Sequence, residues 1–468
     1  MMTEFVPPKP AGNPKKLGPF ARFIKSFHSS TAPLYANSYS MKLGEVRLPR
    51  RTMYFVNQPD LVQNILLGDV DRYPKSDLMA AMLELLLGES IFVSNGNLWK
   101  QQRRMMDPAF ETTRIKAIFP LMREAVDAMA ERFAAGAAGP DTQIDLEMTH
   151  VTADVIFRTI YSRPFTREEA EIIFENFERF QHLAWQHGVW TLAGVPQWLS
   201  LGKLRARRSA MTIRELLHRP VRDRLAAIER GEAVPERDML ASFIRAEDPV
   251  TGKRFDEREL VDQIGIMFLA GHETSASGLA WALYLIAQCP DVQARLQAEA
   301  DAAFADGDLE FADMRRLPFT RDVFRETLRL YPPVAFIPRD ATEEQEMRGK
   351  HIRPGAILFV SPLLEHRHTE HWNDPDTFDP DRFGRAETKA SEQKAYFPFS
   401  KGPRVCLGAA FALQEAVIVL ATIMRDWTVS PVEGHVPKPI ARLTLRSENG
   451  IRLNLERRRK KENQSRLP

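Results

Sequence analysis

The chain has 468 residues, of which 44% are hydrophobic and 27% charged, so it holds enough apolar material for a large core and is not disordered. Its 64 Lys and Arg residues against 62 Asp and Glu residues leave a net charge of +2. No broad basic field is therefore available for the phosphates of a nucleic acid. Two cysteines, Cys289 and Cys406, exclude a disulfide framework and fit a reducing cytoplasm.

The N-terminal segment contains no secretory hydrophobic region with a cleavage site and no run of about 18 apolar residues. This predicts a chain without a transmembrane anchor. Residues 1–40 are expected to form an arm followed by a short helix, on which Phe20, Phe23, Ile24 and Phe27 share one face. We interpret this face as packed on the body of the protein, and contact with a membrane surface is the alternative.

Residues 41–468 are predicted to form a single, mainly α-helical domain with a minor β component, because no linker-like composition divides them. Residues 43–57 have the pattern of strands around a turn. Helical patterns dominate up to about residue 330, short strand patterns return over 334–362, and a last helix is predicted at 407–426.

The longest predicted helix covers residues 258–289, about 48 Å at a rise of about 1.5 Å per residue, and is apolar on nearly every side. In its middle the segment 270–274 reads AGHET. Gly271 costs about 1 kcal/mol relative to alanine in a helix interior. Polar residues beside it, within a buried helix, break the local pattern and indicate either a functional site or a tolerated kink.

Cys406 lies in the segment 399–408, FSKGPRVCLG, directly before the last predicted helix. The positive end of that helix and Arg404 are expected to lower the pKa of the thiol, while Gly402 and Gly408 allow a tight loop around the sulfur. A nucleophilic cysteine requires a histidine base, and a zinc site requires more thiolates than the chain has. An inert core cysteine needs neither the glycines nor the arginine. A thiolate ligand to haem iron is the remaining candidate.

This segment resembles the haem-binding loop of the cytochrome P450 family at each position that defines it: Phe399, Gly402, Arg404, Cys406 and Gly408. Four more segments resemble signatures of the family and occur in its order: WKQQR at 99–103, AGHET at 270–274, ETLR at 326–329 and FDPDRF at 378–383. Ser400 departs from the family, in which glycine is common at this position. The resemblance extends from about residue 40 to the end. It implies a soluble, bacterial-type member whose long central helix lies over the haem.

The resemblance implies a b-type haem whose iron has Cys406 as its axial thiolate ligand, with Phe399 shielding the sulfur. The other cofactor-binding residues that it implies are Gly408 in the loop and, at the haem propionates, Trp99, Arg103, Arg339 and Arg404.

The same resemblance makes O2 a co-substrate and places the catalytic residues on the central helix. Glu273 and Thr274 would relay protons, Gly271 would leave room for O2 over the iron, and Ala270 would face the site. A separate, structural network of buried charges is expected from Glu326, Arg329 and Arg382.

Apolar segments indicate a hydrophobic substrate, namely a fatty acid, a steroid or a terpenoid. The implied pocket residues are Met79, Met82, Phe92, Ala270, Val334, Phe336 and Ile337. Residues 184–200, which contain Trp185, Trp190 and Trp198, resemble the family's mobile lid loop. Helix packing is the alternative explanation for these segments.

Electrons are expected from separate chains, a ferredoxin and a ferredoxin reductase, because the sequence has no length for a fused reductase. The basic residues that would face the ferredoxin are Lys100, Arg104, Arg114, Lys116 and Lys401. These inferences together predict a cytoplasmic, monomeric monooxygenase that inserts one atom of O2 into a C–H bond.

Two other functions remain as alternatives. One is a peroxide-driven peroxygenase or isomerase with the same haem site, and the other is a non-catalytic haem-binding electron carrier or sensor. The histidines of residues 365–371, EHRHTEH, are interpreted as part of an ordinary loop rather than as a metal site.

Overall fold

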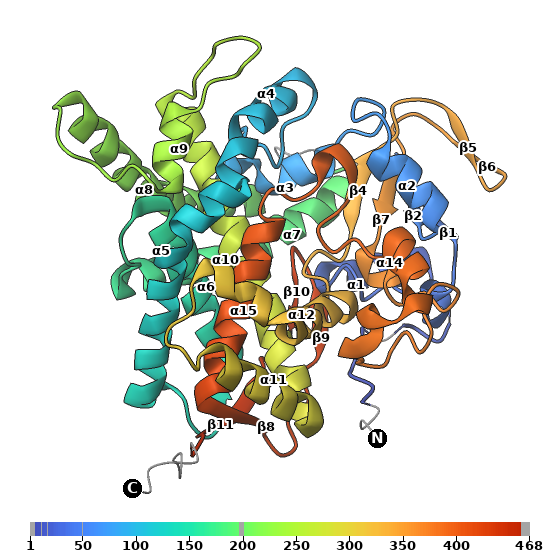
Figure 1. Ribbon diagram of the computed structural model, residues 1–468. Helices are drawn as coiled ribbons and strands as arrows, with labels where there is room; N and C mark the ends of the chain where they lie inside the picture. Colours follow the sequence, from blue (N-terminus) through green and yellow to red (C-terminus); the bar gives the residue numbers. More distant parts are fainter. Residues whose placement is uncertain (1–4, 11, 16, 49, 196–200, 460–468) are drawn as a thin grey trace, which may run out of the picture.

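The computed structural model of the protein describes residues 5–10, 12–15, 17–48, 50–195 and 201–459. Helices form most of the molecule, and a small sheet lies at one side of them (Figure 1). The predicted fold class, mainly α with a minor β component, is confirmed.

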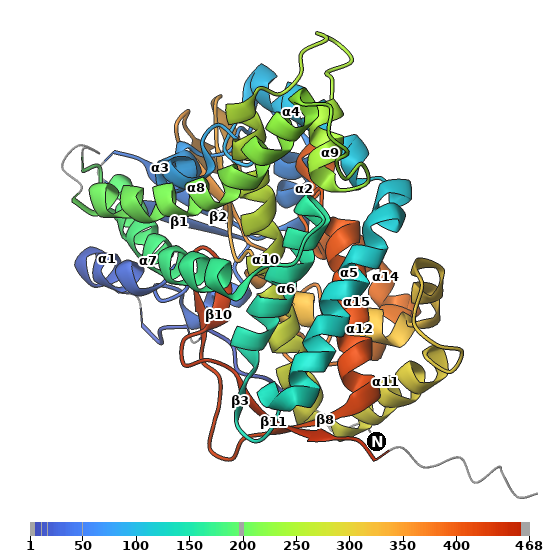
Figure 2. The ribbon, with the colours of Figure 1, turned by 90° about the vertical axis from the view of Figure 1, so that its left-hand side faces the viewer.

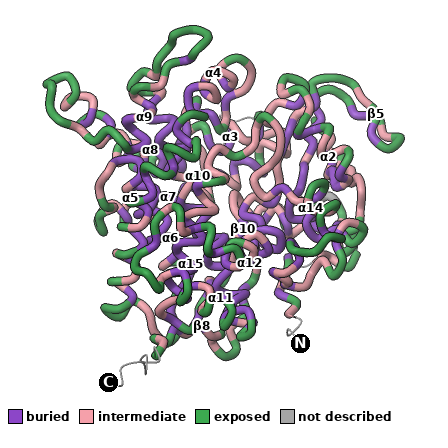
Figure 3. Tube along the Cα trace, in the orientation of Figure 1, coloured by how far each residue is buried: buried purple, intermediate pink, exposed green. Residues whose placement is uncertain are grey.

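Helix α10, Glu257–Gln288, crosses the middle of the molecule (Figures 1 and 3). It begins at Asp256, whose carboxylate accepts the backbone N–H of Glu259 at 2.7 Å, while the Glu259 carboxylate accepts the N–H of Asp256 at 3.0 Å. All residues from Leu260 to Phe268 and from Ser275 to Ala287 are buried. The predicted long buried helix is thus confirmed.

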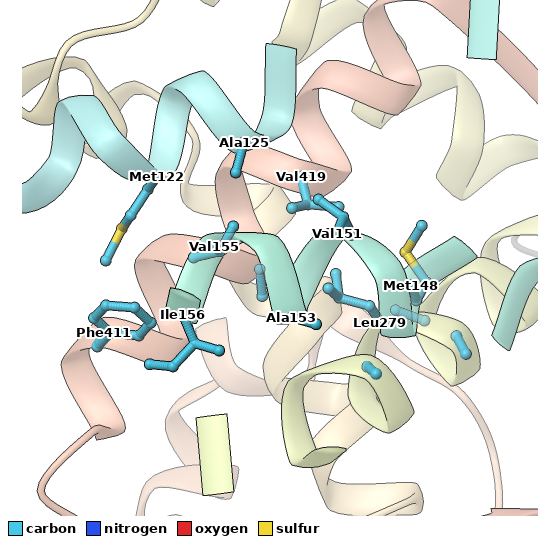
Figure 4. Packing of buried hydrophobic residues seen from close by; sticks show 14 of the residues in the cluster. Met122, Ala125, Met148, Val151, Ala153, Val155, Ile156, Leu279, Phe411 and Val419 are labelled. Carbon is cyan, nitrogen blue, oxygen red and sulfur yellow. The ribbon is translucent and has the colours of Figure 1, made fainter. Parts of the chain in front are cut away.

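Four long helices enclose α10: α6, Ile144–Tyr161, α8, Leu201–Glu229, α12, Pro318–Leu330, and α15, Ala409–Asp426. Helix α5, Thr112–Arg132, packs on α6 and α15. Figure 4 shows small and branched side chains of this core meeting between the helices, among them Ala125, Val151, Val155, Ile156, Leu279 and Val419. Their burial is the main source of stability for this part of the fold.

The other helices lie around this core. They are α1, Pro19–His28, α2, Pro59–Leu67, α3, Asp77–Leu87, α4, Gly96–Met106, α7, Arg167–Leu192, α9, Met239–Arg245, α11, Pro290–Ala303, α13, Pro362–Glu365, and α14, Lys389–Ala395. Helix α7 packs on α8, α3 and α1, and Figure 2 shows α1 and α7 side by side.

The largest sheet has the strand order β1-β2-β7-β4. Its strands are β1, Leu43–Arg47, β2, Thr52–Val56, β7, Ile357–Val360, and β4, Ile337–Asp340. Strands β1 and β2 pair antiparallel, as the strand pattern at 43–57 predicts, whereas β2 and β7 pair parallel across about 300 residues of chain. The sheet therefore joins the N-terminal strands of the domain to strands that follow α12.

Three smaller sheets complete the fold. One contains β3, Thr142–Gln143, β11, Arg452–Arg457, and β8, Trp427–Pro431. The other two are the hairpins β5–β6, Gln345–Met347 and Lys350–Ile352, and β9–β10, Pro439–Ala441 and Leu445–Ser447.

The last helix, predicted at about 407–426, is confirmed at Ala409–Asp426. One sequence-based interpretation is wrong. The segment 184–200 is not a loop over its first half, because α7 continues to Leu192 and a turn follows; its helical hydrogen bonds are stabilised by packing on α8 and α3. Trp198, the last tryptophan of that segment, lies outside the described residues.

The N-terminal segment packs on the body of the protein. The ring of Phe5 contacts that of Tyr284 in α10, with centroids 6.1 Å apart. Phe23 and Phe27 of α1 meet Trp190 of α7 edge to face, whereas Phe20 is 76% exposed. Within the described part of the chain, we find no helix with the length and hydropathy required to cross a bilayer.

A buried ion network holds the segment after α13 against α12. Nε and Nη2 of Arg329 each donate a hydrogen bond to the Glu326 carboxylate at 2.8 Å. Nε of Arg382 donates to the same carboxylate at 3.3 Å. Arg329 also donates to the carbonyl oxygens of His366 at 2.9 Å and Thr377 at 3.0 Å. The contacts predicted between Glu326, Arg329 and Arg382 are therefore present.

We expect Glu326→Ala to lower the free energy of unfolding by about 3–5 kcal/mol, because two guanidinium groups would stay buried without their counter-charge. Urea unfolding followed by circular dichroism measures this loss. The control, Arg321→Ala, removes an exposed pair with Asp322 on the same helix and should cost less than about 1 kcal/mol. Equal losses in the two variants would contradict a structural role for the network.

Candidate active site

The loop before α15 folds back tightly on itself. The N–H of Cys406 donates to the carbonyl oxygen of Phe399 at 2.9 Å, and the N–H of Val405 donates to that of Gly402 at 3.0 Å. Gly402 has φ of +74°, and a side chain there would collide with the backbone carbonyl of Leu66. Only glycine fits this position.

Ser400, two residues earlier, also has a left-handed backbone, with φ of +64°. Glycine adopts this conformation without strain, which explains why a family with this loop favours glycine here. The serine keeps the loop shape at a modest conformational cost, and its buried hydroxyl has no hydrogen-bond partner among the described residues.

The thiol of Cys406 sits at the start of α15, but its pKa is raised rather than lowered. Burial is the main cause, and it outweighs a hydrogen bond from the N–H of Gly408 and the nearby charge of Arg103, which both lower the pKa. The prediction of a lowered pKa is therefore wrong for the protein alone. A cation bound directly to the sulfur would be required to hold it as thiolate.

Cys406 is exposed although protein surrounds it closely enough to raise its pKa. Its side chain therefore keeps accessible surface although protein groups lie close around it. A Cβ at Gly408 would lie 4.0 Å from Sγ, which is an ordinary van der Waals contact, so the space beside the sulfur does not by itself require glycine. An accessible thiol in a protein-rich surrounding is suited to ligate a cofactor.

Cationic groups gather beside Trp99. The guanidinium of Arg404 lies 4.2 Å and the ammonium of Lys75 lies 5.8 Å from the Trp99 ring centroid. Burial and the charge of Arg404 lower the pKa of Arg339 to about 9, and burial lowers that of Arg404 to about 10. Burial, followed by the charges of Arg404, Arg339 and Arg103, lowers the pKa of Lys75 well below its usual value.

Among the described residues, Lys75, Arg339 and Arg404 form no ion pair with a carboxylate. Lys75 donates only to backbone carbonyls, those of Ile91 and Ser94, and Nε and Nη1 of Arg404 are buried without partners. Such a cluster requires an anion from outside the chain. The two propionates of a haem, each a carboxylate with two acceptor oxygens, would supply anions of the required sign.

Lys75 is missing from the sequence-based set, because it lies in no signature segment and contacts the site only through the fold. Arg103, which the sequence analysis placed at the propionates, has other partners. Its Nη1 donates to the carbonyl oxygen of Val405 at 2.7 Å, and its Nε pairs with Asp107 at 2.7 Å. In the structure Arg103 supports the cysteine loop.

The middle of α10 opens at one face. Ala270 is exposed and Thr274 is partly buried, whereas the helix is buried from Leu260 to Phe268 and from Ser275 to Ala287. They are four residues apart and therefore lie on the same face of the helix. The hydroxyl of Thr274 donates to the carbonyl oxygen of Ala270 at 2.6 Å.

Gly271 lies on a different face of α10, the face toward α6. A Cβ built on it would lie 2.8 Å from Cγ1 of Ile156 in α6, one of the core residues in Figure 4. The missing side chain allows α6 to approach α10 closely. The expectation that Gly271 leaves room for O2 is not supported by this geometry, since the glycine faces a neighbouring helix.

Glu273 also departs from its expected role. Its Oε1 accepts hydrogen bonds from Nε2 of Gln181 at 2.8 Å and from Oγ1 of Thr444 at 2.6 Å, and its Oε2 pairs with Arg446. Burial acts to raise the pKa of this carboxyl, but Arg446 and the other donors lower it overall. Both oxygens of this carboxylate are thus bound by donors other than Thr274.

The predicted pocket residues divide into two groups. Met82 packs against the backbone of Gly188 in α7, while Met79, Phe92 and Val334 retain exposed surface. Phe336 packs edge to face on Phe55 and Phe359 of the large sheet, and Ile337 packs on the apolar cluster of that sheet. For these residues a role in substrate binding stays a prediction.

Of the histidines in residues 365–371, His366 contacts the segment just before the cysteine loop. Nε2 of His366 accepts the N–H of Phe397 at 2.9 Å, and the rings of His368 and His371 stack with centroids 4.5 Å apart. Across the residues described, groups of three or more His, Cys, Asp or Glu side chains suited to a metal ion are absent.

Comparisons with known proteins agree with this geometry. The cytochrome P450 family model matches residues 12–455. The chain belongs to the cytochrome P450 family. Cytochrome P450s are haem-thiolate monooxygenases, so the protein is an oxidoreductase that uses O2.

Two similar proteins come from Streptomyces melanosporofaciens. Cyclooctatin synthase is 30% identical over 86% of this chain and 86% of its own. Cyclooctat-9-en-7-ol 5-monooxygenase is 31% identical over 84% of this chain and 83% of its own. Among solved structures, the haem domain of cytochrome P450DA superposes with a TM-score of 0.78 at 26% identity, covering 89% of this chain and 90% of that one.

We expect Gly271→Ala to destabilise the P450 through a clash with Ile156, despite the higher helix propensity of alanine. In an Ile156→Ala background the added methyl group fills the cavity, so the same substitution should be neutral or stabilising. Thermal unfolding of the two single variants and the double variant measures this coupling. Additive effects would show that Gly271 does not serve helix packing.

Lys75→Met should accelerate haem loss about tenfold, because one charge-assisted hydrogen bond to a propionate is worth about 1.5–3 kcal/mol. Transfer of haem to excess apomyoglobin measures the rate. The control is Lys100→Met, which removes an exposed lysine paired with Asp71. Identical haem loss in the two variants would exclude Lys75 from the propionate cluster.

Proposed function

We propose that this P450 hydroxylates an unactivated C–H bond of an apolar terpenoid. In balanced form, R–H, O2, two electrons and two protons give R–OH and water. The observation that carries the proposal is the pairing of the open thiol of Cys406 with the open face of α10 at Ala270 and Thr274, inside an otherwise buried core.

The residues present suit a noncovalent b-type haem, which when bound supplies the iron that activates O2. Cys406 would bind the iron, and Lys75, Arg339 and Arg404, beside Trp99, would hold the propionates. Cys289 is buried beside α11, at the end of α10, with a pKa that burial raises to about 11. It is therefore an inert core thiol, and covalent attachment of the haem through cysteine is not expected.

Thr274 is the residue that we propose for proton handling. Its hydroxyl hydrogen points to the carbonyl oxygen of Ala270, so the lone pairs of Oγ1 are free to accept a hydrogen bond at the open face. A water held there could exchange a proton with O2 bound nearby. Glu273 has no part in this step, because its carboxylate is bound by Gln181, Thr444 and Arg446.

The substrate class rests on the pocket and on the relatives. Met79, Phe92 and Val334 offer exposed apolar surface of the adaptable kind that suits a hydrocarbon skeleton. Cyclooctat-9-en-7-ol 5-monooxygenase and the pentalenene oxygenase of Streptomyces avermitilis, which is 28% identical over 89% of this chain, are named for such skeletons. These names favour a terpenoid over the fatty acid and steroid that the sequence also allows.

We propose a separate ferredoxin, reduced by a ferredoxin reductase, as the electron donor. Arg114 and Lys116 are exposed and suit an acidic partner. Arg104 is removed from the proposed docking set, because it donates to the buried carboxylate of Asp248 at 2.6 Å and 2.9 Å. The remaining cations are Lys100 and Lys401.

The first experiment is a Soret titration of the holoenzyme with pentalenene, palmitic acid and progesterone. A saturable low-spin to high-spin shift with pentalenene alone supports the terpenoid proposal, and a shift with either other probe alone overturns it. A reduced carbon monoxide complex without thiolate character would exclude the haem-thiolate site itself.

Thr274→Ala should reduce the product formed per electron pair at least about tenfold, because a positioned proton donor contributes roughly 10²–10⁴-fold. Thr274→Ser, which keeps the hydroxyl, should retain most of the coupling. The assay uses a surrogate ferredoxin and its reductase. Full activity of Thr274→Ala with peroxide, and no activity of the unsubstituted enzyme with O2 and electrons, would establish the peroxygenase alternative.

A further inference from the structure

A groove lies between α7 and α8 and extends to the turn of the β9–β10 hairpin. Its volume is about 1010 Å³, and Figure 2 shows the two helices crossing this side of the molecule with β10 close to α7. A volume of this size accepts an organic molecule and exceeds what a single inorganic ion requires. The groove lining contains none of the residues proposed to hold the haem, to handle protons or to contact the substrate. It is therefore a feature separate from the candidate active site.

One face of α8 gives the groove much of its positive charge. Arg205, Arg208, Ser209 and Thr212 all line it, and their spacing of three and four residues places them on the same face of the helix. Both arginines are exposed. Arg442, in the turn of the hairpin, contributes a third guanidinium group from a different element. Arg205, Arg208 and Arg442 are called the groove arginines below.

The groove arginines have no carboxylate partner within the described part of the chain. Nε of Arg442 donates to the backbone carbonyl oxygen of His28 at 3.1 Å, and the other two make no side-chain hydrogen bond to a described residue. Farther along α8, by contrast, Arg214 pairs with Asp262 at 2.6 Å. Guanidinium groups that share a groove without counter-charges repel one another, so an anion from outside the chain would stabilise them.

The opposite wall, formed by α7, does not neutralise the groove arginines. Glu175 is paired with Arg179 of the same helix at 2.9 Å, while Glu178 has no ion pair with a described residue. Four arginines and two glutamates line the groove, which gives the lining a net charge of +2 with His182 counted as neutral. The charge of the groove thus favours a ligand with more than one negative charge.

The chemistry of the lining favours phosphoryl groups. Guanidinium groups bind phosphoryl oxygens through paired hydrogen bonds, and guanidinium groups from two elements suit an anion whose oxygens point in several directions. A diphosphate ester has a charge on each of its two phosphoryl groups, and Leu183 in the lining offers an apolar contact to the organic part. A bilayer surface fits less well, because Glu178 lies in the same groove and repels anionic headgroups.

We propose that this groove is a second binding site, which takes an organic diphosphate and holds its phosphoryl groups with the groove arginines. The proposal goes beyond the proposed hydroxylation and does not depend on it, since no groove residue is assigned to the substrate or to the haem.

Isothermal titration of the holoenzyme with geranyl diphosphate tests the site. We expect saturable binding to one site, competition by inorganic pyrophosphate, and an unchanged Soret band because the ligand binds away from the iron. Arg205→Gln and Arg208→Gln should each weaken binding about tenfold, as for loss of a hydrogen bond between charged groups. Arg442→Gln should weaken it from the hairpin side.

Two further variants separate this site from general attraction to a basic helix. Arg207→Gln is the matched control, because Arg207 is exposed and adjoins Arg208 but does not line the groove. It should leave the affinity unchanged. Glu178→Gln removes a negative charge from the lining and should tighten binding about two- to fivefold, which is the range for an exposed charge pair.

Three outcomes would overturn the proposal. Equal affinities of Arg207→Gln and Arg208→Gln would show that the anion follows the overall charge of α8. Binding to phosphatidylglycerol vesicles without binding of the soluble diphosphates would assign the groove arginines to a membrane surface. A Soret shift that parallels the binding of geranyl diphosphate would place this ligand at the haem instead.

Discussion

The burial of α10 constrains nearly every other part of the site. A helix of this length enclosed by α6, α8, α12 and α15 must satisfy or exclude each polar group along it. Gly271 meets this constraint by allowing α6 to approach, and Glu273 meets it by binding donors from two other elements. The packing of these other elements thereby determines which face of α10 stays open, namely the face at Ala270 and Thr274.

Burial also controls the ionisable groups of the cysteine loop and of the cations near it. Burial alone makes the Cys406 thiol harder to ionise, so the protein does not hold a free thiolate but presents a sulfur that a metal ion would ionise. The cations at Lys75, Arg339 and Arg404 are likewise unfavourable without an anion. Both features are costly in the chain alone and become favourable with a haem, which links cofactor binding to stability.

Helix α7 and the β9–β10 hairpin contact α10 through both polar and apolar side chains. Gln181 of α7 and Thr444 of the hairpin donate to the Glu273 carboxylate, and the ring of Phe177 in α7 packs on that of His272 in α10. One buried carboxylate therefore joins three segments that lie far apart in sequence, beside an apolar contact between the same two helices.

The sequence by itself determined the helical fold class, the long buried helix and the Glu326–Arg329–Arg382 network, since each lies in a local pattern or a signature segment. It also singled out Cys406, Arg404 and Thr274 as candidates for the site. Only the tertiary structure decided the neighbours of Lys75, Arg103, Gly271 and Glu273. Residue spacing along a helix shows which face a side chain is on, but not which distant element packs there. The partners of Glu273 come from residues 92 and 171 positions away, and no local pattern encodes such contacts.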